Sequence, residues 1–304
     1  MSQVLTAGPP EQARLFGALS VLAAGLVWSS GGLLVRATEN PTWSILIWRS
    51  LSAGLAIALV LMVQRRGNIA PAFRQLGWLG PFGGVCIGLS MSCFVFALQL
   101  TTVFNTVMML SMSPLLAAAL GWIVLREPVR SSTWVAIGFA MLGILVMVWD
   151  GVETGSLLGN AFGLLATVGF ACFTVLTRAR KTQDSTPCVV LGGLFGSLAA
   201  LLVVQIEGGP VWVGWSDLLL CLAMGFLQIG LGFVFYIWGA RRLSAAEAAL
   251  LALTEVVFGP LWVWLVFRES PSEAAMLGGL ILLGAVAYQA ASGLRKRRPP
   301  VGII

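Results

Sequence analysis

Histidine is absent from this chain of 304 residues. Its absence excludes histidine general bases, Ser–His and Cys–His nucleophile pairs, histidine-ligated haem and most catalytic zinc sites. The five cysteines lie in apolar stretches without CxxC spacing, so they predict neither a disulfide framework nor a metal site. We therefore expect no cofactor and no bound metal.

Charge is also scarce. Charged residues make up 10% of the chain, whereas a typical soluble domain has about 25%. Hydrophobic residues make up 58%, and the mean hydropathy is +0.94. A chain this apolar has too few polar groups to cover a water-facing surface, so the composition indicates a membrane protein.

Ten apolar stretches are each long enough to cross the hydrocarbon core, which takes about 20 residues of helix. The runs are continuous and lack the in–out alternation of barrel strands, so we predict an all-α membrane protein. The ten predicted transmembrane helices cover residues 15–35, 42–63, 78–98, 103–125, 132–149, 156–177, 187–205, 218–240, 246–267 and 274–291.

Basic residues are distributed unevenly between the two sides that these helices create. Fifteen of the 18 fall on the side of the chain termini: Arg14, Arg65, Arg66, Arg74, Arg126, Arg130, Arg178, Arg180, Lys181, Arg241, Arg242, Arg295, Lys296, Arg297 and Arg298. Arg36 and Arg268 fall on the other side, and Arg49 lies inside a span. Since basic loops stay in the cytoplasm, we predict a multi-pass protein of the plasma membrane (the bacterial inner membrane) with both termini cytoplasmic. We interpret the basic tail as an orientation signal that contacts membrane lipids, and expect no nucleic-acid partner.

The chain repeats itself at an offset of 142 residues. Three matches share this offset: Trp122–Glu127 with Trp264–Glu269, Leu34–Ala37 with Leu176–Ala179, and Gly17 with Gly159. Each half carries five spans, and because five is odd, the second copy enters the membrane from the opposite face. We therefore predict two inverted five-helix repeats, 1–150 and 151–304, with a binding site between them near the midplane.

Several short motifs carry a family resemblance. They are Val27–Gly31, Ile45–Arg49, Phe94–Leu98 followed by Asn105, Leu110–Pro114, and the Arg–Glu pair that closes the fourth and ninth spans. With these motifs in this order, the sequence resembles the EamA-like ten-helix group of the drug/metabolite transporter superfamily. The resemblance implies transport of small metabolites through a central cavity lined mainly by helices 1, 3, 4, 6, 8 and 9.

One feature departs from the family pattern. Ser113-Pro114 interrupts the fourth span, but the equivalent positions in the ninth span are Glu255 and Val256, and a proline follows only at Pro260. We therefore predict that any helix break in the second repeat is displaced by about one turn.

Glu255 is the most informative polar residue, because it lies close to the middle of the predicted span 246–267. A charged side chain at the bilayer centre costs about 2.5–3.5 kcal/mol. We expect Glu255 to face a wet cavity, where it could bind a cationic or zwitterionic substrate or carry a coupling proton. The alternative is a structural carboxyl group that is hydrogen-bonded to a neighbouring helix.

Two more charged residues have open roles. Glu247, near the cytoplasmic end of the same span, is a second proton-coupling candidate or a partner of Arg241 or Arg242. Arg49 could turn outward to the interface, pair with an acid or bind a substrate carboxylate. We favour a structural role for Arg49, because helix 2 is usually peripheral in the family that the sequence resembles.

The remaining candidate substrate-binding residues are polar or aromatic side chains inside the spans. They are Trp28, Ser29, Ser30, Asn105, Ser113, Asn160, Phe170 and Gln228. Asn105 and Ser113 occupy the positions that Glu247 and Glu255 occupy in the second repeat, which suits a shared cavity. Each of these side chains could equally serve helix packing or interhelical hydrogen bonding.

We predict a secondary transporter that moves a small organic metabolite, such as an amino acid or related amine, by alternating access, with export as the expected direction. The sequence has no nucleotide-binding motif, which leaves gradient-driven exchange, proton coupling or facilitated diffusion. The alternative is an intramembrane enzyme acting on a small or lipid substrate, although the spans contain no paired aspartates and no serine–lysine pair. A channel would show rings of identical charges. We expect that a monomer is sufficient.

Overall fold

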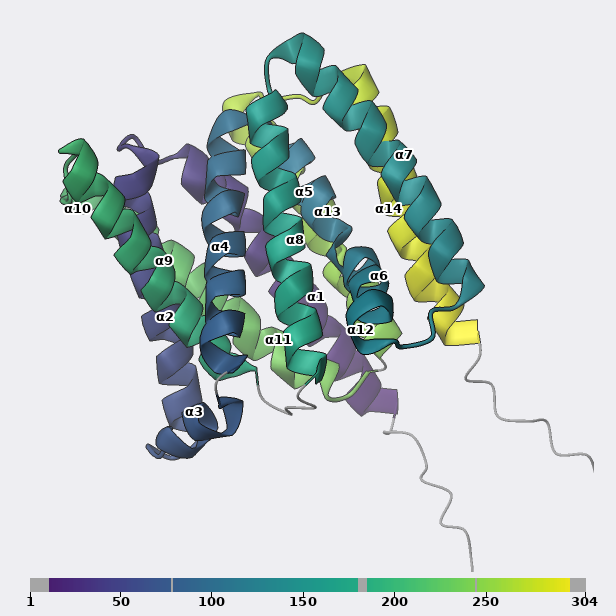
Figure 1. Ribbon diagram of the computed structural model, residues 1–304, viewed down its shortest axis with the longest axis horizontal. Coiled ribbons are helices and arrows are strands. Elements are labelled where there is room, and N and C mark those ends of the chain that lie inside the picture. Colours follow the sequence, from purple (N-terminus) through teal and green to yellow (C-terminus); the bar gives the residue numbers. More distant parts are fainter. Residues whose placement is uncertain (1–10, 78, 180–184, 244, 296–304) are drawn as a thin grey trace, which may run out of the picture.

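The computed structural model describes residues 11–77, 79–179, 185–243 and 245–295 (Figure 1). It confirms ten helical segments that are long and apolar enough to cross a membrane. Seven are single helices: α1 (Glu11–Arg36), α2 (Thr42–Gln64), α4 (Leu79–Leu100), α7 (Ser131–Thr154), α8 (Leu157–Ala179), α9 (Thr186–Glu207) and α14 (Glu273–Arg295).

The other three spans are composite. The fourth joins α5 (Val103–Ser111) to α6 (Ser113–Leu125), and the ninth joins α12 (Ala245–Ala252) to α13 (Thr254–Phe267). The eighth joins α10 (Gly214–Leu222), a π-helix η1 (Ala223–Leu231) and α11 (Gly232–Ala240). A short helix, α3 (Ala70–Leu76), lies outside the ten spans.

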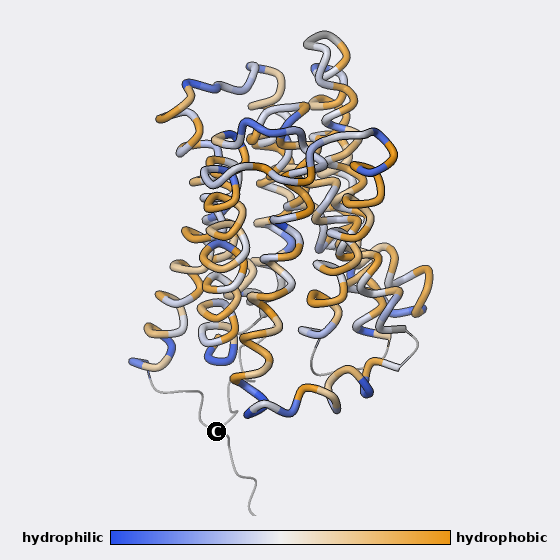
Figure 2. The backbone as a smooth tube through the Cα atoms, turned by 90° about the vertical axis from the view of Figure 1, so that its left-hand side faces the viewer, coloured by the Kyte–Doolittle hydropathy of each residue, from blue (hydrophilic) through white to orange (hydrophobic). Residues whose placement is uncertain are grey.

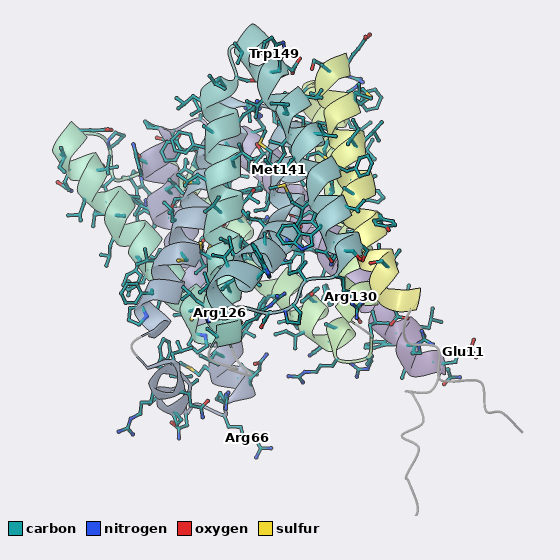
Figure 3. All side chains as sticks on the ribbon, turned by 45° about the vertical axis from the view of Figure 1, so that its right-hand side comes forward. Glu11, Arg66, Arg126, Arg130, Met141 and Trp149 are labelled. Atoms are coloured by element: carbon teal, nitrogen blue, oxygen red, sulfur yellow. The ribbon has the colours of Figure 1, made fainter. Side chains whose placement is uncertain are left out.

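The two ends of the bundle differ in their basic residues. We call the end where α1 begins and α14 ends the terminal side, and the other end the opposite side. Figure 3 shows Glu11, Arg66, Arg126 and Arg130 at the terminal side and Trp149 at the opposite side. The tube in Figure 2 is hydrophobic along most of the helices. Of the predicted basic group, Arg180, Lys181, Lys296, Arg297, Arg298 and the side chain of Arg295 lie outside the described residues. That the terminal side is cytoplasmic stays a prediction.

The two repeats run in opposite directions. α1 leads away from the terminal side, whereas α8, the first helix of the second repeat, leads toward it (Figure 1). The equivalent helices α5 and α12 begin at residues 103 and 245, and α7 and α14 begin at 131 and 273, so both pairs keep the offset of 142. The repeats pack through α2 on α9, α4 on α8, and α7 on α14.

Glycines allow these helices to approach closely, as is common where lipid supplies no hydrophobic driving force. A Cβ atom added to Gly143 of α7 would lie 2.5 Å from the Gly278 carbonyl oxygen of α14. The matched pair Gly17 and Gly159 has a shared role. A Cβ atom added to Gly17 would lie 2.8 Å from Arg242, and one added to Gly159 would lie 2.5 Å from the Leu100 backbone. Residues 100 and 242 are themselves 142 positions apart.

The helix breaks correct one prediction. The first repeat breaks at Met112 and the second at Leu253, one residue from the equivalent position, so the second break is not displaced by a turn. Pro260 lies inside α13 without ending it. Each break carries a hydroxyl group that bonds a carbonyl three residues earlier: Ser111 bonds Met108, and Thr254 bonds Leu251. The second break thus forms without a proline at Val256.

Replacing Gly143 with alanine tests the packing of α7 on α14. Alanine favours helix by about 1 kcal/mol over glycine, but here its Cβ would meet backbone, and overpacking costs about 1–3 kcal/mol. We expect a lower melting temperature of the purified protein in detergent. Gly138→Ala, in the same helix with no atom within 4 Å of the added Cβ, should melt at the native temperature or above. Equal melting temperatures for the two variants would contradict this packing.

Candidate functional site

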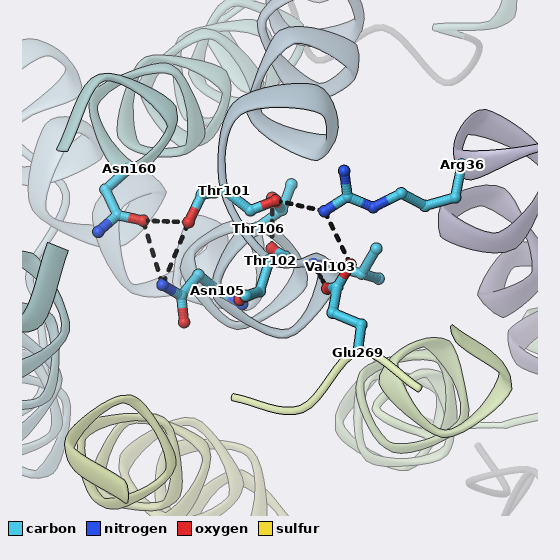
Figure 4. Close-up of polar contacts among 8 residues, drawn as sticks. All are labelled: Arg36, Thr101, Thr102, Val103, Asn105, Thr106, Asn160 and Glu269. Atoms are coloured by element: carbon cyan, nitrogen blue, oxygen red, sulfur yellow. Dashed lines mark hydrogen bonds and ion pairs between the residues drawn. The ribbon is translucent and has the colours of Figure 1, made fainter. Parts of the chain in front are cut away.

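Three polar side chains from neighbouring segments meet near the opposite side of the bundle (Figure 4). Thr101 Oγ1 donates to Asn160 Oδ1 at 2.9 Å, and Asn105 Nδ2 donates to the same oxygen at 3.2 Å. Asn160 Nδ2 donates to the Met147 carbonyl at 3.2 Å. The fully buried Asn160 therefore ties α8 to α5, to α7 and to the end of α4. We call Thr101, Asn105 and Asn160 the asparagine cluster.

An ion pair adjoins the asparagine cluster. Arg36 Nη2 lies 2.8 Å from Glu269 Oε2 and donates to the Thr101 carbonyl at 2.7 Å. Glu269 Oε1 accepts a hydrogen bond of 2.6 Å from the backbone N–H of Val103, the first residue of α5. A helix N-terminus favours a carboxylate, so Glu269 is held by a guanidinium and by a helix end at once.

A cavity of about 560 Å³ opens beside these groups. Its wall includes Arg36, Thr101, Asn105, Asp150 and Glu269. The volume lies within the range of small-molecule pockets, about 300–1,000 Å³. One acceptor at this cavity is unused, because Asn105 Oδ1 is buried and has no hydrogen-bond partner among the described residues.

A second cluster joins α1 to the eighth and ninth spans. Gln228 Nε2 donates to the Trp28 carbonyl at 3.2 Å, and Trp262 Nε1 donates to Ser29 Oγ at 2.9 Å. The Trp28 ring packs 5.3 Å from the Tyr236 ring, measured between centroids. Gln228 lies in η1, and π-helical turns are frequent at functional sites. We call these five residues the tryptophan cluster.

The tryptophan cluster is connected to the terminal side. A cavity of about 680 Å³ there has Tyr236 in its wall, together with Gln64, Arg65 and Arg241. Polar groups thus lie beside a cavity on each side of the bundle. Of the predicted site residues, the tryptophan cluster brings together Trp28, Ser29 and Gln228. The asparagine cluster brings together Asn105 and Asn160.

The remaining predicted site residues are not members of either cluster. Glu255 is half-buried in the first turn of α13, its backbone facing Gly25 of α1, and no hydrogen bond or ion pair of its carboxylate is found among the described residues. Ser113 is buried in the first turn of α6. Ser30 is half-buried and bonds the Val27 carbonyl of its own helix. Phe170 is exposed and meets Phe173 edge-on.

The two other charged candidates also have defined surroundings. Glu247 pairs with Arg14 of α1 at 2.6 Å, a partner that the sequence did not suggest. Arg49 is 3% exposed, so it does not turn outward to the interface. Its Nε and Nη1 atoms have no hydrogen-bond partner among the described residues.

Sequence reasoning missed the roles of Arg36, Glu269, Thr101, Trp262 and Tyr236. For Arg36 and Glu269 a signal existed, because both belong to motifs that recur at the offset of 142. The recurrence indicates a duplication, and it does not by itself indicate that Arg36 and Glu269 form an ion pair. Nothing in the sequence links the ends of the first and ninth spans, which are brought together by the tertiary structure.

The fold and these clusters define a class: a ten-span membrane protein of two inverted repeats with polar groups between them. Residues 15–149 and 157–288 each match the EamA-like transporter family, and the chain belongs to that family. It is therefore a multi-pass membrane protein of a transporter family.

Similar proteins carry the same designation. An uncharacterized transporter of Bacillus subtilis, YwfM, is 25% identical over 91% of this chain and 95% of its own. An uncharacterized transporter of Archaeoglobus fulgidus is 22% identical over 89% and 95%, and one of Clostridium kluyveri is 23% identical over 70% and 71%. A solved crystal structure is similar in fold, with a TM-score of 0.63 and 19% identity over 94% of this chain and 100% of that chain.

The asparagine cluster predicts a specific loss of stability. Asn160→Ala removes the acceptor of Thr101 and Asn105, and an unpaired buried polar group costs about 1–3 kcal/mol. We expect a lower melting temperature in detergent. Thr174→Ala is the matched control, since the Thr174 hydroxyl bonds the Phe170 carbonyl of its own helix, α8. A native melting temperature for Asn160→Ala would show that the cluster does not hold the helices together.

Proposed function

We propose that the protein is a secondary transporter that moves a small organic metabolite, such as an amino acid or related amine, across the plasma membrane. Export by alternating access is the mode we favour, with both termini in the cytoplasm and the units 1–150 and 151–304 rocking on each other. Two inverted repeats whose fourth and ninth spans break at nearly equivalent positions, Met112 and Leu253, support this proposal. Substrate sites of such transporters lie at the repeat interface, beside broken helices.

The broken helices place helix N-termini inside the spans. α6 and α13 begin within the span, and the N-terminus of a helix attracts negative charge through its free N–H groups. Glu255 stands in the first turn of α13, a favourable place for a carboxylate. Its carboxylate has no bonding partner among the described residues, so it is free to meet a substrate ammonium group or a proton.

We assign the substrate-binding groups to the tryptophan cluster, the asparagine cluster and the two helix breaks. Trp28, Ser29, Ser30, Gln228 and Phe170 would bind from the α1, η1 and α8 side, and Asn105, Asn160 and Ser113 from the side of the asparagine cluster and the first break. Glu255 would neutralise a cationic group or carry the coupling proton, and Glu247 is the second candidate for the proton. A monomer surrounded by lipid would be sufficient, and the substrate would be returned chemically unchanged.

A ligand screen tests the substrate class. Purified protein is heated with amino acids, amines, nucleosides and vitamins, and a substrate should raise the melting temperature because it binds the folded state. Each stabilising compound is then loaded into proteoliposomes, and its exit is followed by mass spectrometry. Recovery of a chemically altered compound would instead favour an intramembrane enzyme.

Glu255→Gln tests the proton role. Glutamine keeps the size and the hydrogen-bonding capacity of the side chain but cannot exchange a proton, so flux driven by a pH gradient should be lost. Glu247→Gln serves as the comparison, since Glu247 pairs with Arg14 near the membrane surface. Coupled flux that is unchanged in Glu255→Gln would refute the proton role of Glu255 and leave Glu247 as the candidate.

A further inference from the structure

Two ion pairs occupy equivalent positions in the two repeats. Arg36 pairs with Glu269 on the opposite side, and Arg178 pairs with Glu127 on the terminal side. Both the two arginines and the two glutamates are 142 residues apart. Each arginine lies in the last turn of the first helix of its repeat, and each glutamate belongs to the other repeat. Each pair therefore joins one repeat to the other, one on each side of the membrane.

The backbone prepares both glutamates in the same way. The residue before each glutamate, Arg126 in one repeat and Arg268 in the other, ends its helix in the left-handed conformation, with φ of 55° and 57°. That conformation is uncommon for residues other than glycine. Its occurrence at both positions means that the two repeats present Glu127 and Glu269 with the same local geometry.

The two pairs nevertheless differ in state. The charged atoms of Arg36 and Glu269 are 2.8 Å apart, and the side chains are 22% and 20% exposed. Those of Arg178 and Glu127 are 3.9 Å apart, beyond hydrogen-bonding distance, and both side chains are 48% exposed. The opposite-side ion pair (Arg36–Glu269) is closed, and the terminal-side ion pair (Arg178–Glu127) is loosened.

Helix packing shows the same asymmetry. On the opposite side α5 packs against α13, where Val107 is 6% exposed and an added Cβ on Gly259 would lie 3.7 Å from it. The equivalent contact on the terminal side would join α12 to α6. In the described part of the chain these two helices do not pack to a comparable extent, and Ala249, the counterpart of Val107, is exposed.

We propose that the opposite-side and terminal-side ion pairs are alternating closures, of which one is formed at a time. In this proposal the structure represents the conformation whose opposite-side ion pair is formed and whose terminal-side ion pair is loosened. In the alternate conformation the two repeats exchange roles: Arg178–Glu127 shortens as α6 approaches α12, and Arg36–Glu269 separates as α5 leaves α13. The inference rests on the proposed transport function and identifies four residues that set the balance between its two conformations.

Thiol labelling measures this balance without a substrate. Val107→Cys is nearly isosteric and is buried while α5 packs on α13, so its reaction with a trimethylammonium methanethiosulfonate reagent reports opening of the opposite side. Ala249→Cys reports the terminal side in the same way. The modified fraction at each position is read by mass spectrometry, so the native cysteines can remain. Purified full-length protein in lipid nanodiscs exposes both sides to the reagent.

Glu269→Gln should shift labelling toward the opposite side. It weakens the bonds to Arg36 and to the Val103 N–H, and losing charged hydrogen bonds of this kind should raise the Val107→Cys labelling rate about tenfold. Labelling of Ala249→Cys should fall. Glu273→Gln, another acid at the opposite side but in α14 and outside the ion pair, should leave both rates unchanged.

The double variant separates alternation from simple loosening. Glu127→Gln weakens only the conformation in which the opposite side is open. Added to Glu269→Gln, it should therefore lower Val107→Cys labelling below that of Glu269→Gln alone. If both substitutions merely loosened the structure, labelling of the double variant would be higher than that of either single variant.

Two results would overturn the proposal. The first is that Glu269→Gln changes the labelling rate of Val107→Cys by less than twofold. The second is that the double variant Glu127→Gln/Glu269→Gln labels faster at Val107→Cys than Glu269→Gln alone. If Glu269→Gln does not fold, Arg36→Gln takes its place with the same expected outcome. Because the readout needs no substrate, failed labelling shifts would leave transport itself open to the proteoliposome assay. Absence of transport with the expected labelling shifts would refute the proposed function alone.

Discussion

The hydrocarbon of the bilayer offers no hydrogen-bond partner to a peptide group, and this constraint governs the whole structure. It explains why every span is helical and why side-chain hydroxyl groups bond the backbone where a helix is interrupted. At the breaks near Met112 and Leu253, the hydroxyl groups of Ser111 and Thr254 bond carbonyl oxygens of the preceding turn. Such irregular backbone is tolerated where protein surrounds it or where it lines a cavity, which is why the breaks point to the site.

The same constraint makes buried polar side chains tie the helices together. Asn160 uses its amide to connect three segments, and Gln228 reaches from η1 to the Trp28 carbonyl of α1. Glycines bring the backbones near enough for these short contacts. The polar clusters thus form a framework of hydrogen bonds between the helices.

Much of this arrangement could be predicted from residue patterns. The spans and the duplication follow from apolar runs and an offset of 142, because each depends on the bilayer or on the chain order alone. The predicted displacement of the second break was wrong, because the break comes at Leu253 without a proline and Pro260 lies inside α13 without ending it. The pairing of Glu247 with Arg14 could not be predicted, because helix packing brings together residues more than 230 positions apart.

The sequence by itself determined ten helices, two repeats of opposite direction and the residue types available between them, since hydropathy and periodicity act locally. Only the tertiary structure decided which of those residues meet. Arg36 and Arg178 stand in equivalent motifs, yet one pair is closed at 2.8 Å and the other is loosened at 3.9 Å. A repeated motif encodes the same local geometry twice. The packing of α5 on α13 breaks the symmetry, because the described parts of α12 and α6 do not pack on each other to a comparable extent.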